Sequence, residues 1–498
     1  MFEKKKKIEE ISSSMVSNNA SIKRHKHMIS DLPNNVLVHI LSFLSTKDAI
    51  KTSILSTKWR YLWTYLSVFD FRFFYYQKNR NPSHSLLDVV ATLLEKSKDH
   101  LIEIKRITVR IPQVTLNADK VTFLVTSLLS LKVQDLEFSI EDLRYLNARR
   151  ELPLGFSGSY LLSKLTLNLT GYTLNISNAI QFPSLKTLNL KYATFPNEES
   201  VEEFFSGCPR LEELTLINCY WLHIQKLTIA ISTLRKLTIH FNHYCLQHCD
   251  DFDKFSVKID AVNLLSLTCT SDPTIQFVIV NPPTSMLDAY IAFSLHFPWD
   301  DRTHALYEEY LSRCAVVLLS GLASVKYLTL SNDTFQESPY VNDRFHLLPK
   351  FHNLTHLCLD SDICSFSRTS FTKFLLKCPK LEVLVFPLGS GILRQDDNHG
   401  WKSIPVPRCI KSSLKKLHIT DFCGYSWDIQ FVEFFLENAT VLEKFQISLS
   451  CSPLSKYNWK NLADLKNQFV GMGSCDIKFR LAKSAIKMQN FCKKCYGF

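Results

Sequence analysis

A cluster of histidines, cysteines and aspartates in the middle of the sequence has the residue types that bind metal ions. Imidazole nitrogens, thiolates and carboxylates are the ligands that zinc takes in proteins. The spacing matches no standard zinc finger, and the segment lies between two apolar stretches that we expect to be strands. We therefore favour a polar loop over a metal site, and we expect no metal and no cofactor. The residues are His240, His243, Cys245, His248, Cys249, Asp250 and Asp251.

Catalysis would require a recognisable constellation of residues, and the sequence offers none. The motifs G-x-S-x-G, G-x-x-x-x-G-K and H-E-x-x-H are absent, and residues 155–158 read as a turn. Cys492 and Cys495 form a C-x-x-C pair with no second pair nearby. Cys495 is also the fourth residue from the end, as in a prenylation box, but Tyr496 and Gly497 are not the aliphatic pair preferred there. We predict a protein that is not an enzyme.

Charge and composition indicate a folded protein without a nucleic-acid site. The formal net charge is +11, and only the lysine-rich N-terminal tail concentrates it. A nucleic-acid binder usually concentrates its charge on one element, interleaved with aromatic residues. No apolar segment has the form of a signal peptide or the length of a membrane span, so the fifteen cysteines indicate reduced thiols. We expect a protein of the nucleus or cytoplasm that binds neither nucleic acid nor a membrane.

One apolar pattern recurs from about residue 100 to residue 450 and predicts the architecture. Each copy has apolar residues at positions 1, 4 and 6, and successive copies mostly begin 23 to 33 positions apart. The pattern resembles leucine-rich repeats, which contribute one short strand per unit. Cys219 takes the position where the consensus has Asn or Cys, to bond the turning backbone. The copies begin at Ile104, Val133, Leu162, Leu185, Leu211, Leu234, Leu264, Val325, Leu354, Leu381, Leu414 and Leu442, and a degenerate copy begins at Leu287.

Segments with helical spacing connect the predicted strands. Phe204 and Phe205 lie on one apolar face, and Pro209 ends that helix before the next strand. The same arrangement recurs around Phe371 and Phe431. One unit cannot bury its own apolar face, so the units must stack. We predict an α/β fold, a solenoid with parallel strands on the concave face and helices on the convex face, whose concave face binds another protein.

A distinct block, residues 28–72, precedes the repeats and reads as three short helices. Asp31 is suited to cap the first helix, with Pro33 in its first turn. An apolar stripe at i, i+3, i+4 spacing then runs from Val36 to Leu44, and Ser45 precedes the second helix. So small a module buries too little to be strongly stable alone, so part of its apolar surface is expected to bind a partner helix.

This block resembles a plant F-box. The resemblance rests on the stretch from Asp31 to Leu44, D-L-P-N-N-V-L-V-H-I-L-S-F-L, and on its continuation from Thr46 to Trp63. It implies a surface that binds a Skp-type adaptor, which connects to a cullin scaffold carrying the ubiquitin-conjugating machinery. The residues implied to form or support that surface are Leu32, Pro33, Val36, Leu37, Ile40, Leu41, Leu44, Leu55, Trp59, Leu62 and Trp63.

The sequence departs from the F-box pattern at two places. The family usually has Pro where this chain has Ser45, and a basic pair where it has Thr57-Lys58. Both departures concern the affinity for the adaptor more than the fold.

A second resemblance lies near the C-terminus. The stretch from Trp401 to Cys409, followed by Leu414, Gly424 and 435–439, resembles the FBD region of plant F-box proteins with leucine-rich repeats. It sharpens the classification and implies no chemistry.

The resemblance implies a non-catalytic substrate-recognition subunit of an SCF-type (Skp–cullin–F-box) E3 ubiquitin ligase, whose repeats bind the target protein. Two alternatives are a small-molecule-sensing F-box receptor, which a deep polar and aromatic pocket would favour, and an interaction scaffold without a ligase role. We assign the chain as 1–27 disordered basic tail, 28–72 F-box, 73–400 solenoid, 401–450 FBD region continuing the solenoid, and 451–498 C-terminal tail.

Overall fold

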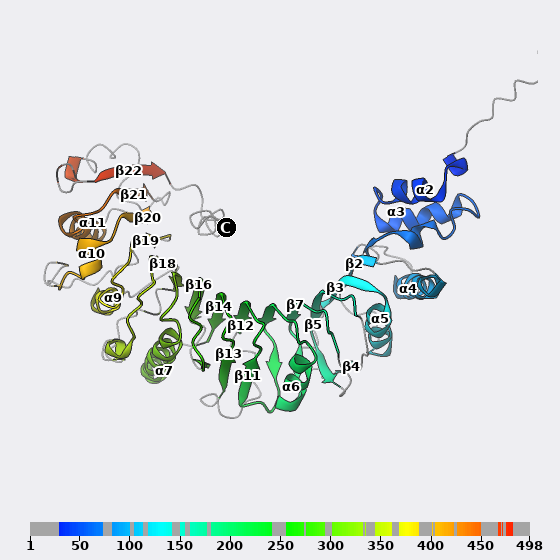
Figure 1. Ribbon diagram of the computed structural model, residues 1–498, viewed down its shortest axis with the longest axis horizontal. Helices are drawn as coiled ribbons and strands as arrows, with labels where there is room; N and C mark the ends of the chain where they lie inside the picture. The colour runs from blue at the N-terminus through cyan, green and yellow to red at the C-terminus, as the bar shows by residue number, and fades with distance from the viewer. Residues whose placement is uncertain are drawn as a thin grey trace, which may run out of the picture.

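The chain forms an arc with helices at its N-terminal end and strands at its C-terminal end (Figure 1). None of the described helices combines the length and the apolar character that crossing a bilayer requires. The computed structural model describes residues 29–72, 82–99, 104–112, 118–141, 150–154, 160–176, 181–241, 255–272, 275–293, 301–331, 334, 344–360, 368–387, 401, 404–422, 426–449, 467–469, 471 and 475–481.

One long sheet of parallel strands lines the inner side of the arc (Figure 1). Among the described residues it has fifteen strands, whose order in the sheet follows their order in the chain. Each repeat therefore adds one strand beside the last, as a solenoid requires. The strands are β1 (Val68–Asp70), β2 (Ile104–Pro112), β3 (Val133–Glu141), β5 (Lys164–Leu169), β7 (Thr187–Lys191), β9 (Glu213–Ile217), β12 (Lys236–His240), β14 (Ser266–Ser271), β16 (Asp288–Phe293), β17 (Tyr327–Leu330), β18 (His356–Leu359), β19 (Val383–Phe386), β20 (Lys416–Phe422), β21 (Lys444–Leu449) and β22 (Asp476–Leu481).

The register of these strands aligns the same apolar position of successive repeats. Leu188 of β7 is the Cα partner of Leu214 of β9, which is the partner of Leu237 of β12. Side chains alternate between the two faces of a strand, so these buried leucines form rows in the core and the residues between them line the concave face. A degenerate copy does fill this gap, because β16 pairs with β14 on one side and with β17 on the other. It begins at Met286 and not at Leu287 as predicted, since the buried residues are Met286, Ala289 and Ile291.

The turn after β9 contains the cysteine predicted from the repeat consensus. Cys219 is buried, and its thiol donates to the backbone oxygens of Leu190 at 3.6 Å and Ile217 at 3.8 Å. The thiol therefore bonds the turning backbone of its own repeat and of the preceding repeat, as the consensus predicts.

Helices pack on the outer side of the arc and carry many of the phenylalanines (Figure 1). Phe204, Phe371 and Phe431 are fully buried, which confirms that these aromatic side chains belong to the core. The helices after the N-terminal module are α4 (Pro82–Asp99), α5 (Ala118–Ser130), α6 (Glu198–Ser206), α7 (Asp301–Ser320), η8 (Phe345–Leu347), α9 (Arg368–Leu375), α10 (Arg408–Ser412) and α11 (Ser426–Asn438).

Helices do not cover the whole outer side, which corrects the prediction in the middle of the solenoid. Among the described residues, strands form two further parallel sheets there, ordered β10-β8-β6-β4 and β11-β13-β15. In β13 the buried Val257 and Ile259 alternate with polar residues, which is the period of a strand and not of a helix. The strands are β4 (Arg150–Leu154), β6 (Tyr172–Ile176), β8 (Thr194–Phe195), β10 (Tyr220–Trp221), β11 (Lys226–Ala230), β13 (Ser256–Asp260) and β15 (Gln276–Ile279).

The main sheet also extends into residues 451–498, which the sequence analysis assigns to a tail. β22 pairs in parallel with β21 over six residues. Ile477 and Phe479 pack against the core and alternate with the exposed Lys478 and Arg480, as in the other strands. Part of this segment is therefore solenoid.

Candidate functional site

The first helix of the N-terminal module begins later than predicted. α2 (Asn34–Leu41) starts directly after Pro33, which has φ −59° and ψ 149° and makes no side-chain cap. Asp31 closes a short 3-10 helix, η1 (Ile29–Asp31). The residue before a proline disfavours helical backbone, so α2 cannot include Leu32. The predicted cap at Asp31 is wrong.

The second helix, α3 (Thr46–Lys51), is capped by Ser45 and continues into a 3-10 turn, η2 (Thr52–Ile54). The Ser45 hydroxyl accepts from the Asp48 backbone N–H at 3.2 Å and donates to Asp48 Oδ2 at 2.7 Å. Hydrogen bonds from Lys51 and then from Ser45 hold the pKa of Asp48 below its ordinary value. A serine at the position where the family usually has Pro therefore starts this helix by a different means.

We expect Ser45→Ala to destabilise α3 by about 1 kcal/mol, because the helix loses its only side-chain cap among the described contacts. Amide exchange in residues 46–51, followed by mass spectrometry on the full chain, should become about fivefold faster. Ser67→Ala, at another exposed serine of the module, is the control. Equal exchange in both variants would show that the cap contributes nothing.

The third predicted helix is a single 3-10 turn, η3 (Leu62–Tyr65). The chain just before it holds the start of the module in place. Lys58 Nζ donates to the backbone oxygens of Ser30 at 2.7 Å and Leu32 at 2.8 Å. Trp59 Nε1 donates to the Ser30 hydroxyl at 3.0 Å. Lys58, at the second departure from the family pattern, therefore fixes the segment that contains Leu32.

The residues implied to form or support the adaptor-binding surface divide into two sets. Those at most 4% exposed are Leu37, Leu41, Trp59, Leu62 and Trp63. The exposed ones are Leu32, Pro33, Val36, Leu44 and Leu55, and Ile40 is half-buried. The apolar stripe of a helix turns toward the protein's own core, so the buried set supports the module. The five buried side chains are inaccessible to another protein while the module stays folded, whereas the exposed ones and Ile40 are accessible.

Two residues that the sequence analysis does not select are the most exposed large apolar side chains among the described residues. Ile54 is 88% exposed and Phe43 is 77% exposed. Both lie next to exposed leucines, Leu55 and Leu44, and outside the helical stripe. Adjacent apolar residues in the turns between helices were the available sequence signal. We call Leu32, Pro33, Val36, Phe43, Leu44, Ile54 and Leu55 the exposed apolar set.

A strand, and not a free linker, joins the module to the solenoid. β1 pairs in parallel with β2. The Asp70 backbone N–H donates to the Thr46 hydroxyl at 2.8 Å, which ties β1 to α3. Phe69 and Phe71 are fully buried and stack at 6.0 Å between ring centroids. The orientation of the module on the solenoid is therefore fixed by backbone and core contacts.

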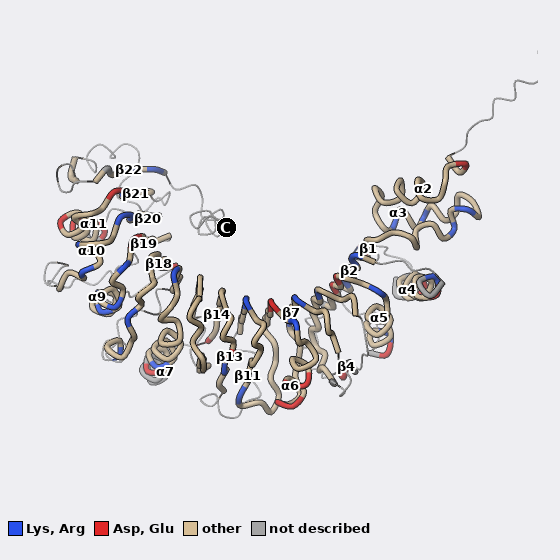
Figure 2. Tube along the Cα trace, in the orientation of Figure 1, with Lys and Arg blue, Asp and Glu red and all other residues tan. Residues whose placement is uncertain are grey.

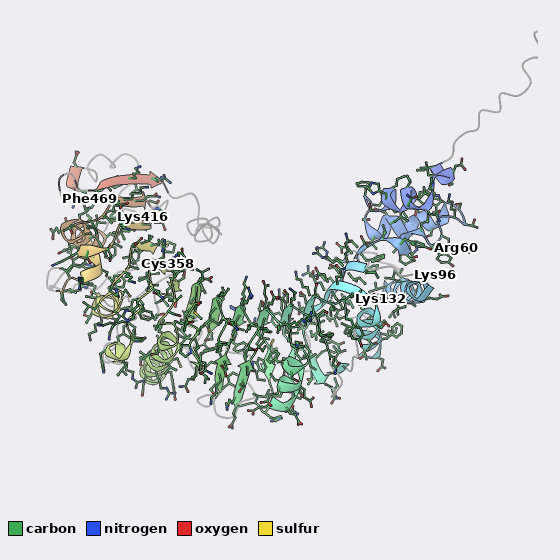
Figure 3. All side chains as sticks on the ribbon, in the orientation of Figure 1. Arg60, Lys96, Lys132, Cys358, Lys416 and Phe469 are labelled. Carbon is green, nitrogen blue, oxygen red and sulfur yellow. The ribbon has the colours of Figure 1, made fainter. Side chains whose placement is uncertain are left out.

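α4 lies against the same junction. Lys96 Nζ is 4.8 Å from the centroid of the Tyr61 ring, a cation–π contact between α4 and the module. Figure 3 shows Lys96 close to Arg60, where the module meets the solenoid.

The concave face of the middle strands is polar and uncharged in its central row. Hydroxyl and amide side chains there suit hydrogen bonding to a bound protein, and they lack the paired acid and base that catalysis requires. Asn189 Nδ2 donates to the Thr166 hydroxyl at 3.0 Å. The successive Cα partners in this row are Thr166, Asn189, Thr215, Thr238 and Thr268.

The next strands of the concave face carry aromatic side chains. The Tyr327 and His356 rings are 4.6 Å apart between centroids. The Tyr290 hydroxyl donates to Asp360 Oδ2 at 3.3 Å. Burial lowers the pKa of His356, so its imidazole is neutral at pH 7. Aromatic residues are enriched among those that contribute most binding energy at protein interfaces.

Of the histidines, cysteines and aspartates considered as metal ligands in the sequence, only some lie within the described residues. His240 ends β12, and burial lowers the pKa of its imidazole. The other members of that cluster, from His243 to Asp251, lie outside the described residues, as do Cys492 and Cys495. Within the described ranges, no three such ligands are arranged to hold a metal ion.

These features define a class: a leucine-rich-repeat solenoid with a rigidly attached helical module that exposes apolar side chains. Comparison with known proteins supports this class along the chain. The F-box domain model matches residues 29–71. The model described as FBD-associated F-box protein At5g56370, LRR repeats, matches residues 122–277, and the FBD model matches residues 402–447.

Full-length relatives give the family. F-box/FBD/LRR-repeat protein At5g22660 of Arabidopsis thaliana is 28% identical over 441 residues, covering 88% of this chain and 93% of that protein. F-box/LRR-repeat protein At4g14096 of the same plant is 30% identical over 437 residues, covering 84% and 87%. The chain belongs to the plant F-box proteins with an FBD region and leucine-rich repeats.

Among solved structures, the TLR13–ssRNA13 complex matches 78% of this chain and 64% of that chain, with a TM-score of 0.24 and 12% identity. So low a similarity carries no argument. The solenoid rests on the strand order and register described above.

Proposed function

We propose that this chain is a substrate-recognition subunit of an SCF-type ubiquitin ligase. The F-box module binds a Skp-type adaptor, the adaptor connects to a cullin, and the concave face of the repeats binds the target protein. The chain takes no covalent step. It raises the effective concentration of target lysines near the conjugating enzyme and orients them. We expect this complex in the nucleus or cytoplasm.

The exposed apolar set is the observation that carries this proposal. Exposed apolar surface on a soluble protein marks interaction sites, and this module exposes seven apolar residues between Leu32 and Leu55. Burial of one such side chain contributes roughly 1.5–3 kcal/mol. Burial of Ile54 and Phe43 by an adaptor would therefore supply a large part of the binding energy.

The junction with the solenoid supports the same proposal. Proximity catalysis requires that the adaptor and the target be held at a fixed distance and orientation. Pairing of β1 with β2, and burial of Phe69 and Phe71 between module and repeats, remove a hinge at this point. A target on the concave face would thus be presented in one direction.

We expect Leu32→Ala with Pro33→Ala to weaken binding of a purified Skp-type adaptor at least about tenfold, the size of effect seen at residues central to an interface. Both side chains are exposed, so the fold should be retained, which circular dichroism would check. The matched control is Leu265→Ala with Pro282→Ala, an exposed leucine and proline of the solenoid. Equal affinity of the two double variants would contradict the assigned surface.

A further inference from the structure

We propose that the last three strands of the concave face bind an acidic, carboxylate-rich extended segment of the target protein. The inference rests on the proposed function, because such a segment is a ligase substrate only if the module recruits the adaptor. The strands are β20, β21 and β22, and their basic residues at concave positions are Lys416, Lys444, Lys478 and Arg480. We call these four residues the basic strip.

The burial pattern places the strip on the concave face. Lys416 and Lys444 are exposed, and the residues that follow them, Leu417 and Phe445, are buried in the core. Figure 2 shows Lys and Arg on β20 and on β22, in the C-terminal arm of the arc. Figure 3 places Lys416 in this arm, near Cys358 of β18. The strip is therefore part of the surface that the solenoid presents to a bound protein.

On the other described strands of the main sheet, wherever two charged residues are Cα partners, their charges are opposite. Arg106 of β2 pairs with Asp135 of β3, with 2.7 Å between Nε and Oδ2. Glu213 of β9 is the Cα partner of Lys236 of β12. Opposite charges on facing positions of neighbouring strands stabilise a sheet.

The basic strip breaks this rule. Lys416 and Lys444 are direct Cα partners, and they are the one like-charged pair of partners among the described strands of the main sheet. Like charges in this position destabilise a sheet, and a bound anion would relieve the repulsion. Neither ammonium forms an ion pair with a described residue.

Acidic residues are fewer than basic residues on these strands. β20, β21 and β22 together contain four basic residues and two acidic ones, Asp421 and Asp476, and Asp476 is the Cα partner of Lys444. Glu382, at the edge of the sheet, is paired with Lys415 at 3.2 Å. Glu443 is a second carboxylate at that edge.

The adjacent His418 is a further titratable group on this face. Burial lowers the pKa of His418, a hydrogen bond with Gln446 opposes this effect, and the charge of Arg480 adds to it. The lowered pKa favours the neutral imidazole at pH 7, so His418 adds little to the positive charge of the strip.

The spacing favours an extended acidic peptide. Lys478 and Arg480 are two residues apart on one strand, about 6.6 Å, which equals the separation of alternate side chains on an extended segment. Three strands span only about 10 Å, whereas nucleic acids bind along tracts of many cations with stacking aromatics.

The test uses the full chain and a fluorescent ten-residue peptide of alternating Glu and Ser, with a Gln and Ser peptide as the neutral probe. Fluorescence polarisation should show binding of the acidic probe that weakens as salt rises. Lys416→Glu with Lys444→Glu should weaken it at least about tenfold. The matched control is Lys226→Glu with Lys258→Glu, two lysines on neighbouring strands β11 and β13 of the outer side, which should stay within about twofold.

Three results would overturn the inference: equal binding of the neutral probe, equal loss in the outer-side control, or tighter binding of a single-stranded DNA with the same number of charges. Lys416→Gln with Lys444→Gln serves if the Glu variant loses its circular dichroism signal. Adaptor binding is measured on the same samples and should be unchanged by the strip variants. If the native chain binds the acidic probe but not the adaptor, the ligase role fails and the acidic-segment site stands.

Discussion

Replacing Ile54 and Leu55 together by Asp should weaken adaptor binding by about 100-fold or more while leaving the fold intact. The two side chains are 88% and 61% exposed, so the free protein loses little packing. In the complex, each carboxylate would be buried without a partner, and burial of an unpaired charge is among the largest penalties at an interface. A loss of about 2.7 kcal/mol corresponds to the 100-fold change.

The control for this prediction is Val262→Asp with Val280→Asp. These valines are 51% and 48% exposed and lie on the solenoid. Both double variants gain two negative charges and lose exposed apolar surface. A difference in adaptor affinity between them is therefore due to where the substitutions lie and not to the type of substitution. Isothermal titration calorimetry with the adaptor should show a much weaker affinity for the Ile54→Asp, Leu55→Asp variant than for this control. Similar affinities would mean that the exposed apolar set is not the contact surface.

Of the substitutions proposed for this protein, Trp221→Ala should lower the free energy of unfolding the most, by about 3–5 kcal/mol. Trp221 is 1% exposed and stacks on Phe195 at 5.1 Å between ring centroids. It also contacts Phe241 at 5.7 Å and Phe255 at 6.4 Å, so it joins the outer strands to the main sheet. Its removal leaves a cavity where four aromatic rings meet.

Urea unfolding followed by circular dichroism measures this effect on the intact chain. Tyr160→Ala is the control, because Tyr160 is 72% exposed and its removal should change stability by no more than about 0.5 kcal/mol. If Trp221→Ala unfolds at the same urea concentration as the control, the aromatic cluster does not hold the two layers together.

The main sheet could be predicted from the sequence because each repeat needs the same apolar positions. Stacked units share one core, so the same apolar pattern recurs along the chain and can be recognised in the sequence. β22 was not predicted, because its copy of the repeat pattern has Ser474 at the first apolar position. Only two of the three apolar positions, Ile477 and Phe479, match the pattern. The strands on the outer side were not predicted, because some repeats show clear helical spacing in their return segments and helices were expected in all of them. Short return segments such as β13 instead show the period of two.

The candidate site could be predicted only in part. Leu37 and Leu32 both fit the F-box pattern, but one is buried and the other is 37% exposed. Helical spacing cannot separate them, because side chains that face the core and side chains near its edge follow the same period. The basic strip has no local sequence signal. Its residues are spread from Lys416 to Arg480, and only the stacking of three repeats brings them together.

Size-exclusion chromatography with light scattering, on a mixture of the full native chain and a Skp-type adaptor, measures whether the two proteins form a complex. We expect a single peak whose mass corresponds to one chain and one adaptor, and we expect Ile54→Asp with Leu55→Asp to abolish it. Separate elution of the two native proteins, with the chain folded by circular dichroism, would contradict the ligase role. The chain would then be a leucine-rich-repeat protein whose F-box module serves another partner.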